Sequence, residues 1–386
     1  MRMIFYASLF FILWHNVVYG LLLILISFIK ENRISNNLQN NYLPYVSMII
    51  AVHNEEQVIE NKIKNIVDLE YPKDKLEIIF ASDNSTDKTN KIISEFAKQY
   101  KNIKLINTQK RGGKVNAYNT AFKYASGEIL AFSDANTIWE KSSLKKLVAQ
   151  LQDKDVSCVC GHLIYTNTDE SEIAYSEGVY WKIENMTKEG ESKFYSLTAL
   201  NGGIYALKKK DYIMIEPLYS HDLCMPLFLG VQRKRTIFVK NALAFERSGT
   251  TSEDEIKRKR RMFGRIYSFF FRNISLFINP FIYDFRFFLS VFSRRTIRYL
   301  LPFEHLLLFI STIILAKSGL IFEMVLYGHI LFIALAVQGY FLKRKIKLLF
   351  LPYYYILFLQ SMLLGFFDFI TGRIKPYWDV AKTTRG

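Results

Sequence analysis

The sequence predicts an α/β domain with a doubly wound, mainly parallel sheet, joined to membrane-associated helices. Between residues 45 and 151, short β-type runs alternate with amphipathic helical stretches, as in parallel βαβ units. Long apolar stretches precede and follow this region. Half of the 386 residues are hydrophobic, yet the mean hydropathy is only +0.07, so the membrane-like segments occupy only part of the chain.

The first apolar stretch, residues 5–29, is long enough to span a bilayer. Because it lacks a small-residue cleavage site, we expect an anchor rather than a signal peptide. The cations that follow it place its C-terminal end in the cytoplasm. Within it, His15 and Asn16 could contact a membrane-embedded substrate, but we favour a neighbouring helix. Residues 1–32 are thus an expected N-terminal transmembrane helix.

The α/β region begins at residue 45. The glycine-rich motif of dinucleotide-binding domains, G-x-G-x-x-G, is absent after its first strand. A nucleotide would therefore not be held as it is in a dehydrogenase. The expected strands are 46–54, 76–83, 102–108, 127–135 and 156–163, and the expected helices are 55–69, 88–100, 115–125 and 141–151.

The chain has three cysteines, an odd and sparse set that indicates no disulfide framework. Cys158 and Cys160 lie in an apolar strand-like run and point to the same face. We expect buried core cysteines rather than a metal site, consistent with a reducing compartment.

The formal net charge of +16 is concentrated beside apolar segments, at 258–265, 294–295 and 343–347. This placement favours a cytoplasmic membrane face with anionic lipids as partners. An anionic substrate would also suit it, whereas nucleic acid is excluded because nucleic-acid-binding motifs are absent from the sequence.

The C-terminal part contains further apolar segments. Residues 266–292 are rich in Phe and Ile but broken by charges, which is typical of helices in the membrane interface. Residues 299–316 and 320–342 are expected spans. Residues 348–370 either span the membrane, which would put the tail outside, or lie in the interface or re-enter, which would leave the tail in the cytoplasm. The cations of the tail favour a cytoplasmic tail, and so a segment that does not span. The expected units after the anchor are 33–265 (cytoplasmic domain), 266–298 (interfacial helices), 299–371 (membrane region) and 372–386 (tail).

Three acidic groups follow one another along the chain, around Asp83, Asp134 and Asp222, and an Arg-rich block follows them. The first two end apolar runs, so their carboxylates are expected at the carboxyl ends of strands, where open α/β sheets bind ligands. Acids and cations together at such an edge suit a metal–diphosphate ligand.

These motifs, in this order, give residues 46–265 a resemblance to the inverting family 2 glycosyltransferases. The segment is most similar to the membrane-integrated branch with hyaluronan, cellulose and poly-N-acetylglucosamine synthases and bacterial exopolysaccharide enzymes. The resemblance implies a GT-A (nucleotide-diphospho-sugar transferase) fold plus an α-helical transmembrane region. It also implies a nucleotide-sugar donor, usually a UDP-sugar, and Mg²⁺ or Mn²⁺ as cofactor.

The resemblance assigns donor binding motif by motif. The run ending at Glu55 looks like the family's P-x-Y-N-E, Asp83 resembles the nucleoside-holding aspartate, and Arg111 to Lys114 is similar to R-x-G-K. Asp134 takes the place of the first acid of D-x-D, while Asn136 offers only a neutral oxygen. The implied nucleotide-sugar ligands are Ala51, His53, Asn54, Glu55, Asp83, Arg111, Lys114, Asp134, Ala135, Arg258 and Arg261; the implied metal ligands are Asp134 and Asn136.

Asp222 stands where the family has T-E-D, which implies a general base for the acceptor hydroxyl, worth roughly 10²–10⁴-fold in rate. As a residue on its own it could equally be a helix N-cap. His221 replaces an acid, and the sequence does not explain why. The segment Asn201-Gly202-Gly203 resembles the part that shapes the acceptor pocket, although two glycines also simply allow a tight turn.

Arg258 and Arg261 occupy the place of Q-x-x-R-W and share a helix face, where they could clamp the leaving diphosphate. A positive-inside belt is the alternative. The Gln and Trp of that motif are missing, which counts against long-chain polymerisation. Tyr180, Trp181 or Trp378 could instead stack on an acceptor sugar. The tail around Trp378 resembles the endings of bacterial exopolysaccharide glycosyltransferases, which implies a return to the active site.

The sequence therefore predicts a multi-pass enzyme of the inner (plasma) membrane with a cytoplasmic catalytic domain. It would transfer sugar to a lipid-linked or growing polysaccharide acceptor in bacterial exopolysaccharide or capsule synthesis, with accessory export proteins as partners. Single addition to a polyprenyl-linked acceptor is one alternative, and a non-catalytic assembly or transport subunit is another.

Overall fold

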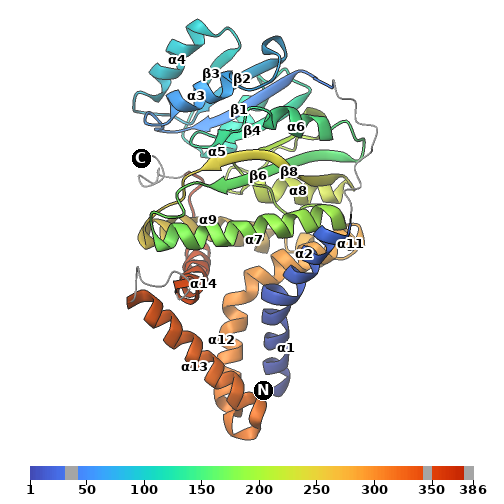
Figure 1. Ribbon diagram of the computed structural model, residues 1–386, viewed down its shortest axis with the longest axis vertical. Coiled ribbons are helices and arrows are strands. Elements are labelled where there is room, and N and C mark those ends of the chain that lie inside the picture. The colour runs from blue at the N-terminus through green and yellow to red at the C-terminus, as the bar shows by residue number, and fades with distance from the viewer. Residues whose placement is uncertain (31–41, 342–349, 378–386) are drawn as a thin grey trace.

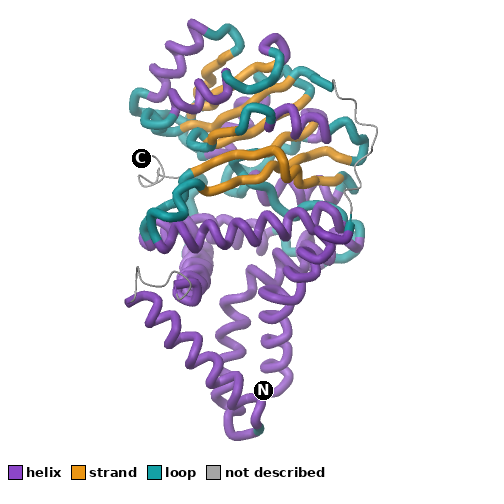
Figure 2. The backbone as a smooth tube through the Cα atoms, viewed as in Figure 1, coloured by secondary structure: helices purple, strands orange, loops and turns teal. Residues whose placement is uncertain are grey.

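The computed structural model describes residues 1–30, 42–341 and 350–377. An α/β part forms one end of the molecule and a group of long helices projects from it (Figure 1). Helices α7 (Glu172–Phe194) and α9 (Ser252–Arg272) lie between the sheet and that group. Figure 2 shows that all strands are gathered in the first part.

The sheet has eight strands in the order β3-β2-β1-β4-β7-β6-β8-β5. Its first half, β3 to β4, is parallel as predicted. The second half is mixed, since β7 runs antiparallel to both β4 and β6 while β8 is parallel to β6. The strands are β1 (Val46–Val52), β2 (Leu76–Ser82), β3 (Ile103–Asn107), β4 (Ile129–Asp134), β5 (Ile138–Trp139), β6 (Val156–Tyr165), β7 (Tyr205–Lys208) and β8 (Arg235–Glu246).

Both faces of the sheet are buried, which explains why its central strands read as continuous apolar runs. Side chains alternate along β1, so that Ile49 and Ala51 join one core while Met48 and Ile50 join the other. Cys158 and Cys160 are fully buried in the first core, as expected for packing cysteines. The helices beside the sheet are α3 (Ile59–Val67), α4 (Thr89–Gln99), α5 (Lys114–Phe122), α6 (Ser143–Gln150) and α8 (His221–Val231).

Helix α9 is continuous across the expected domain boundary at residue 265. The side chain of Thr251 caps its first turn by accepting the Asp254 amide at 3.3 Å. The helix then runs through the Arg-rich block into the Phe-rich segment. The charged stretch and the apolar stretch, which look like two regions in the sequence, are therefore the first and second halves of one amphipathic helix.

Among the residues that the structure describes, four helical segments are long and apolar enough to cross a membrane: Arg2–Ile29, Phe285–Ser318, Leu320–Phe341 and Phe350–Ile370. The second begins 14 residues before the expected start at residue 299, because α11 (Phe285–Val291) continues through the π-helix η4 (Phe292–Thr296) into α12 (Ile297–Leu315). The short helix α10 (Ser275–Ile278) precedes it, and α13 and α14 are the last two segments.

Polar contacts join the N-terminal segment to the start of the second one. The segment comprises α1 (Arg2–Leu13), the π-helix η1 (Trp14–Val18) and α2 (Tyr19–Ile29). His15 Nδ1 lies 2.9 Å from the carbonyl oxygen of Ser293, and Tyr19 donates to Ser290 at 2.9 Å. The expected contacts with neighbouring helices are confirmed for both residues, since the Asn16 side-chain oxygen accepts a bond of 3.4 Å from the Tyr355 hydroxyl of the last helix, while its NH₂ group donates to Ile12.

Helix α14 (Phe350–Ile370) packs along α9, while α1, α12 and α13 point away from the sheet (Figure 1). Its Asp368 carboxylate accepts two bonds of 2.6 Å from the Arg260 guanidinium. Residues 371–377 consequently return to the α/β part. On which side of a membrane this tail lies stays a prediction.

Candidate active site

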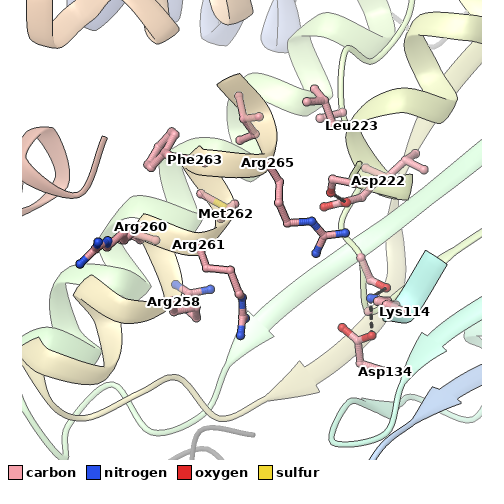
Figure 3. Close-up of a pocket in the computed structure, with 18 of the residues that line it drawn as sticks. Lys114, Asp134, Asp222, Leu223, Arg258, Arg260, Arg261, Met262, Phe263 and Arg265 are labelled. Atoms are coloured by element: carbon pink, nitrogen blue, oxygen red, sulfur yellow. Dashed lines mark hydrogen bonds and ion pairs between the residues drawn. The ribbon is translucent and has the colours of Figure 1, made fainter. Parts of the chain in front are cut away.

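A cavity of about 1080 Å³ lies between the carboxyl ends of β1 and β4 and the helices α7 and α9 (Figure 3). Thirteen of the residues proposed from the sequence line it: Ala51, Glu55, Lys114, Asp134, Ala135, Asn136, Tyr180, Trp181, Gly202, Gly203, Asp222, Arg258 and Arg261. The structure does not bring His53, Asn54, Asp83, Arg111 or Asn201 to the cavity wall, and Trp378 lies outside the described residues.

Asp134 and Lys114 form an ion pair in the cavity (Figure 3). Asp134 is the last residue of β4, beside Ala51 of β1, and Lys114 is the first residue of α5. Burial works to lower the pKa of Lys114, but Asp134, Tyr118 and Asp222 outweigh it and raise that pKa above its usual range. The ammonium therefore stays charged and is suited to an anionic ligand.

Asp222 lies in the first turn of α8, close to this pair. The helix N-cap is Ser220, which donates to the Asp222 carboxylate, so Asp222 is not itself the cap. Gly202 lies against both groups: a Cβ atom there would be 3.3 Å from Lys114 Nζ and 3.8 Å from Asp222 Oδ2. Two carboxylates and one ammonium thus meet beside a position kept open by glycine.

His221 faces the core and does not line the cavity. Its Nδ1 lies 2.8 Å from the Tyr205 hydroxyl, and its ring packs against Tyr118, at 5.4 Å between centroids, and Tyr212, at 5.5 Å. Burial lowers the pKa of His221 to about 3, so the ring is neutral. The histidine that replaces an acid of the family motif is therefore a packing residue.

Asp83 holds a loop behind the cavity wall. It is fully buried, and its carboxylate accepts the amides of Gly112 and Gly113 at 2.9 and 2.7 Å. His53 Nδ1 lies 2.8 Å from the Asp83 carbonyl oxygen, and Asn54, at φ 54°, accepts the Thr86 amide. These three residues fix the loops that follow β1 and β2, and so position Lys114.

Glu246 is a cavity residue that the motifs did not reveal. It ends β8 and accepts bonds of 3.0 Å from the Asn136 amide and the Thr137 hydroxyl. Asn136 thereby turns its NH₂ group toward a carboxylate, which leaves its oxygen for another partner. No local pattern around Glu246 signals this role, because its partners come from a segment 110 residues away.

Helix α9 presents its arginines in different directions (Figure 3). Arg258 is held by Glu177 and Glu255 at 2.6 and 2.9 Å. Arg265 lies near Asp222, and its Nε donates to the Leu218 carbonyl at 2.8 Å in the loop before α8. The sequence placed Arg265 in the basic block but gave it no role.

The aromatic residues proposed for sugar stacking already contact cations. Lys259 and Arg298 lie 5.5 and 5.6 Å from the ring centroid of Tyr180, and Lys188 lies 5.1 Å from that of Trp181. Asn201 is fully buried and donates to the Gly161 carbonyl at 2.7 Å. Asn201 thus supports the segment that carries Gly202 and Gly203.

The described part of the tail closes one side of the cavity. The Arg111 guanidinium lies 4.5 Å from the ring centroid of Tyr377. A Cβ atom on Gly113 would lie only 2.0 Å from the Pro376 carbonyl oxygen, so the two segments touch through their backbones. Arg373, Ile374, Lys375 and Tyr377 line the cavity.

The α/β part is similar to proteins of known family. Residues 47–213 match the family model described as Glycosyl transferase family 2. This stretch is therefore similar to a family 2 glycosyltransferase domain. This domain contains β1 to β7, with Lys114 and Asp134, and ends before Asp222.

The domain is similar to "Probable glycosyltransferase YdaM" of Bacillus subtilis (strain 168), at 33% identity over 189 residues, which is 47% of this chain and 43% of that protein. It is also similar to "Beta-monoglucosyldiacylglycerol synthase" of Nostoc sp., at 34% identity over 163 residues, which is 42% of this chain and 35% of that protein. The matches therefore span less than half of these relatives' length.

A solved structure matches almost the whole chain. It is the "Mannosyltransferase PcManGT from Pyrobaculum calidifontis in complex with GDP-Man and Mn2+", with a TM-score of 0.72, 19% identity, and coverage of 96% of this chain and 99% of that one. At this identity the likeness concerns the fold alone. The predicted GT-A domain with added apolar helices is confirmed.

Proposed function

We propose that the chain is a membrane-integrated, inverting glycosyltransferase that moves a sugar from a nucleotide-sugar, such as a UDP-sugar, to a lipid-linked acceptor. The observation that carries this is the meeting of Asp134, Lys114 and Asp222 at one end of a cavity that also reaches Tyr299 and Phe358 of the apolar helices. Two relatives support a lipid acceptor by name: the glucosyldiacylglycerol synthase and a dolichyl phosphate-sugar transferase of Methanococcus voltae, 32% identical over 162 residues.

In this proposal Asp222 is the general base, taking the proton of the acceptor hydroxyl as its oxygen attacks the anomeric carbon. Attack from the face opposite the leaving nucleotide inverts that centre. Lys114 at the start of α5, and Arg261 and Arg265 on α9, all line the cavity and would stabilise the diphosphate as it leaves. Glu55 and Ala51 lie at the end of β1, where the base and ribose are expected.

A divalent cation would fit this site if it were shared between the protein and the donor diphosphate. Among the described residues, no cluster of three or more His, Cys, Asp or Glu side chains is placed to hold a metal. Mg²⁺ and similar ions, however, commonly bind one or two carboxylates together with substrate phosphates. Asp134 would supply the carboxylate and Asn136 a neutral oxygen. The ion would neutralise charge on the donor diphosphate.

The decisive experiment follows nucleotide release by detergent-purified protein with Mn²⁺ or Mg²⁺, a panel of nucleotide sugars and total lipid extract. Wild type would be compared with Asp222→Asn and with Asp68→Asn, a control whose side chain is 67% exposed and does not line the cavity. Release from one donor by wild type and the control, but not by Asp222→Asn, supports the proposal. Activity in Asp222→Asn contradicts the assigned base.

The size of the product separates two acceptors. A single added sugar on lipid supports transfer to a polyprenyl-linked or similar acceptor, which the missing Gln and Trp of the polymerase motif favour. A long product instead supports a growing polysaccharide acceptor in exopolysaccharide or capsule synthesis. No release from any donor, in the presence of lipid extract, favours a non-catalytic assembly subunit.

A further inference from the structure

Buried cations gather where α7 meets the beginning of α12. Lys188 of α7 and Arg294, Arg295 and Arg298 of η4 and α12 form this group, called here the cationic cluster. Lys188, Arg294 and Arg295 are 2, 6 and 5% exposed, and the side chain of Arg298 is 11% exposed. Lys188, Arg295 and Arg298 line the cavity described above.

The carboxylates near the cationic cluster balance only part of its charge. Arg294 lies 2.7 Å from Glu184 and 3.7 Å from Glu191, and Arg298 lies 3.9 Å from Glu184. Burial works to raise the pKa of Glu184, but Arg294, Lys188 and Arg298 outweigh it and keep the carboxyl ionised. Within the part of the chain that the structure describes, four cations thus face two carboxylates.

The neighbouring ion pairs do not supply the missing negative charge. Glu177 and Glu255 also lie near the cavity, but they are paired with Arg258 and Lys259 of α9. That second group is balanced, with two cations and two carboxylates. A buried charge without a counter-ion is costly, so the excess in the cationic cluster indicates a ligand.

Arg295 shows where such a ligand would bind. Its Nε donates to the Thr198 hydroxyl at 2.9 Å. Its Nη2 is buried and has no hydrogen-bond partner among the described residues. A buried guanidinium N–H group in a cavity wall needs a hydrogen-bond acceptor, and an anion would supply one. The planar guanidinium group of arginine is well suited to bond two oxygens of a phosphate or a carboxylate.

We propose that the cationic cluster is a phosphate subsite for the acceptor, so that the acceptor hydroxyl belongs to a group carried on an alkyl or isoprenyl phosphate and not on a neutral lipid. This inference rests on the proposed function and names the substrate class of the same cavity. A phosphate group is negatively charged at neutral pH and would offset positive charge in the cluster. A neutral diacylglycerol would leave that excess uncompensated.

The position of the subsite agrees with a lipid phosphate. Arg295 and Arg298 lie near the start of the apolar segment Phe285–Ser318. Tyr299 and Phe358, from α12 and α14, line the cavity beside them and offer apolar surface to a lipid chain. The donor diphosphate would bind elsewhere in the cavity, near Asp134 and Asp222. There the Lys114 ammonium, which pairs with Asp134, supplies the positive charge.

The test measures binding to the full-length protein in detergent, so it does not depend on turnover. Farnesyl phosphate is the probe, and farnesol, inorganic phosphate and phosphatidylglycerol vesicles are the comparisons. Wild type should bind farnesyl phosphate at least about tenfold more tightly than farnesol, and Arg295→Gln should lose about tenfold, as for one charge-assisted hydrogen bond. Arg295→Lys should retain part of the affinity.

Arg272→Gln is the matched control, because it removes one arginine charge from an exposed site at the end of α9 that does not line the cavity. It should bind like wild type. Arg298→Gln, checked for an unchanged melting temperature, replaces Arg295→Gln if the latter does not fold. Equal binding by wild type and both cluster variants, or equal binding of farnesol and farnesyl phosphate, overturns the subsite.

Two further outcomes concern the source of the phosphate. If phosphatidylglycerol competes as well as farnesyl phosphate, the cluster holds a bulk lipid head group and the acceptor assignment is wrong. If the enzyme releases nucleotide, Arg295→Gln should raise KM for the phosphorylated acceptor, whereas Arg272→Gln should not change it. A protein that binds farnesyl phosphate but transfers no sugar keeps the subsite and overturns only the proposed function.

Discussion

At the scale of single residues, the proposed chemistry depends most on Asp222. Its carboxylate lies beside Gly202 and the Lys114–Asp134 pair, where an acceptor hydroxyl could reach it. Asp222→Asn keeps the size of the side chain and removes its basicity. We expect transfer to fall about a hundredfold or more, with donor affinity little changed. Initial rates of nucleotide release and donor titrations check this, and a variant of wild-type rate would refute the role.

Gly113 illustrates a residue whose backbone, rather than side chain, matters. Its φ of +88° lies in the region that glycine tolerates, and an added Cβ would lie 2.0 Å from the Pro376 carbonyl oxygen. We expect Gly113→Ala to cost about 1–2 kcal/mol in backbone strain, in addition to the collision with the tail. Its melting temperature should fall and its donor KM should rise.

The control for this substitution is Gly328→Ala on α13, where an added Cβ meets no atom within 4 Å. It should not lower the melting temperature, because alanine favours a helix interior over glycine, and it should leave the donor KM unchanged. A Gly113→Ala protein that matched this control in both measurements would show that the contact between the loop and the tail is unimportant.

The sequence could locate some site residues and not others for a physical reason. Asp134, Lys114 and Asp222 were found because each lies in a short local motif that resembles one of the family's motifs. Glu246 and Arg265 were missed, since their partners lie in distant segments that only folding brings together. For the same reason, the packing role of His221 became visible only with its aromatic neighbours in place.

At the scale of elements, Lys62 joins α3 to the end of β4. It is fully buried, and its ammonium donates to the Ser133 hydroxyl at 2.7 Å. Burial lowers the pKa of Lys62 to about 7, although Asp134 and Glu246 work against that shift. A lysine pKa that is lower in the folded state makes folding less favourable at every pH below the pKa of the unfolded state.

The sign of the pH effect follows from this shift. Below pH 7 Lys62 is protonated in both states, and its unfavourable contribution is fully present. Between pH 7 and about 10.5 the free energy of unfolding should rise by up to about 1.4 kcal/mol per pH unit. Lys62→Met should abolish this rise. Melting temperatures of both proteins between pH 7 and 10, without added metal, provide the test; parallel curves would contradict it.

Among the elements, the sequence predicted those with a local signal. Strands β1 to β4 and helices α3 to α6 follow from the alternation of apolar and amphipathic runs, and their parallel pairing is as expected. The antiparallel place of β7 has no such signal, because strand neighbours depend on the path of the whole chain. The continuity of α9 was missed because its composition changes halfway along the helix.

At the scale of the whole molecule, one pair of helices connects the apolar segments to the cavity. Helix α9 carries Arg258, Arg261 and Arg265, while α14 carries Phe358 and leads into residues 371–377 at the cavity wall. The two helices touch through Gly264 and Gly365. Movement of α14 in a membrane would therefore be transmitted directly to the arginines and the tail.

Gly365→Leu tests this connection. A Cβ atom at Gly365 would lie 2.7 Å from Phe263 Cβ and 2.8 Å from the Arg260 carbonyl oxygen, so a larger side chain must separate α14 from α9. We expect the melting temperature to fall by several degrees and transfer to fall by about tenfold, as in other overpacked contacts that cost 1–3 kcal/mol. Trypsin should also cleave faster after Arg373. Gly328→Leu, on a helix face with open space, supplies the control.

A different result would contradict the proposed connection. If Gly365→Leu transferred sugar at the wild-type rate although Arg373 had become sensitive to trypsin, the tail and α14 would contribute to the architecture of the cavity but not to its chemistry.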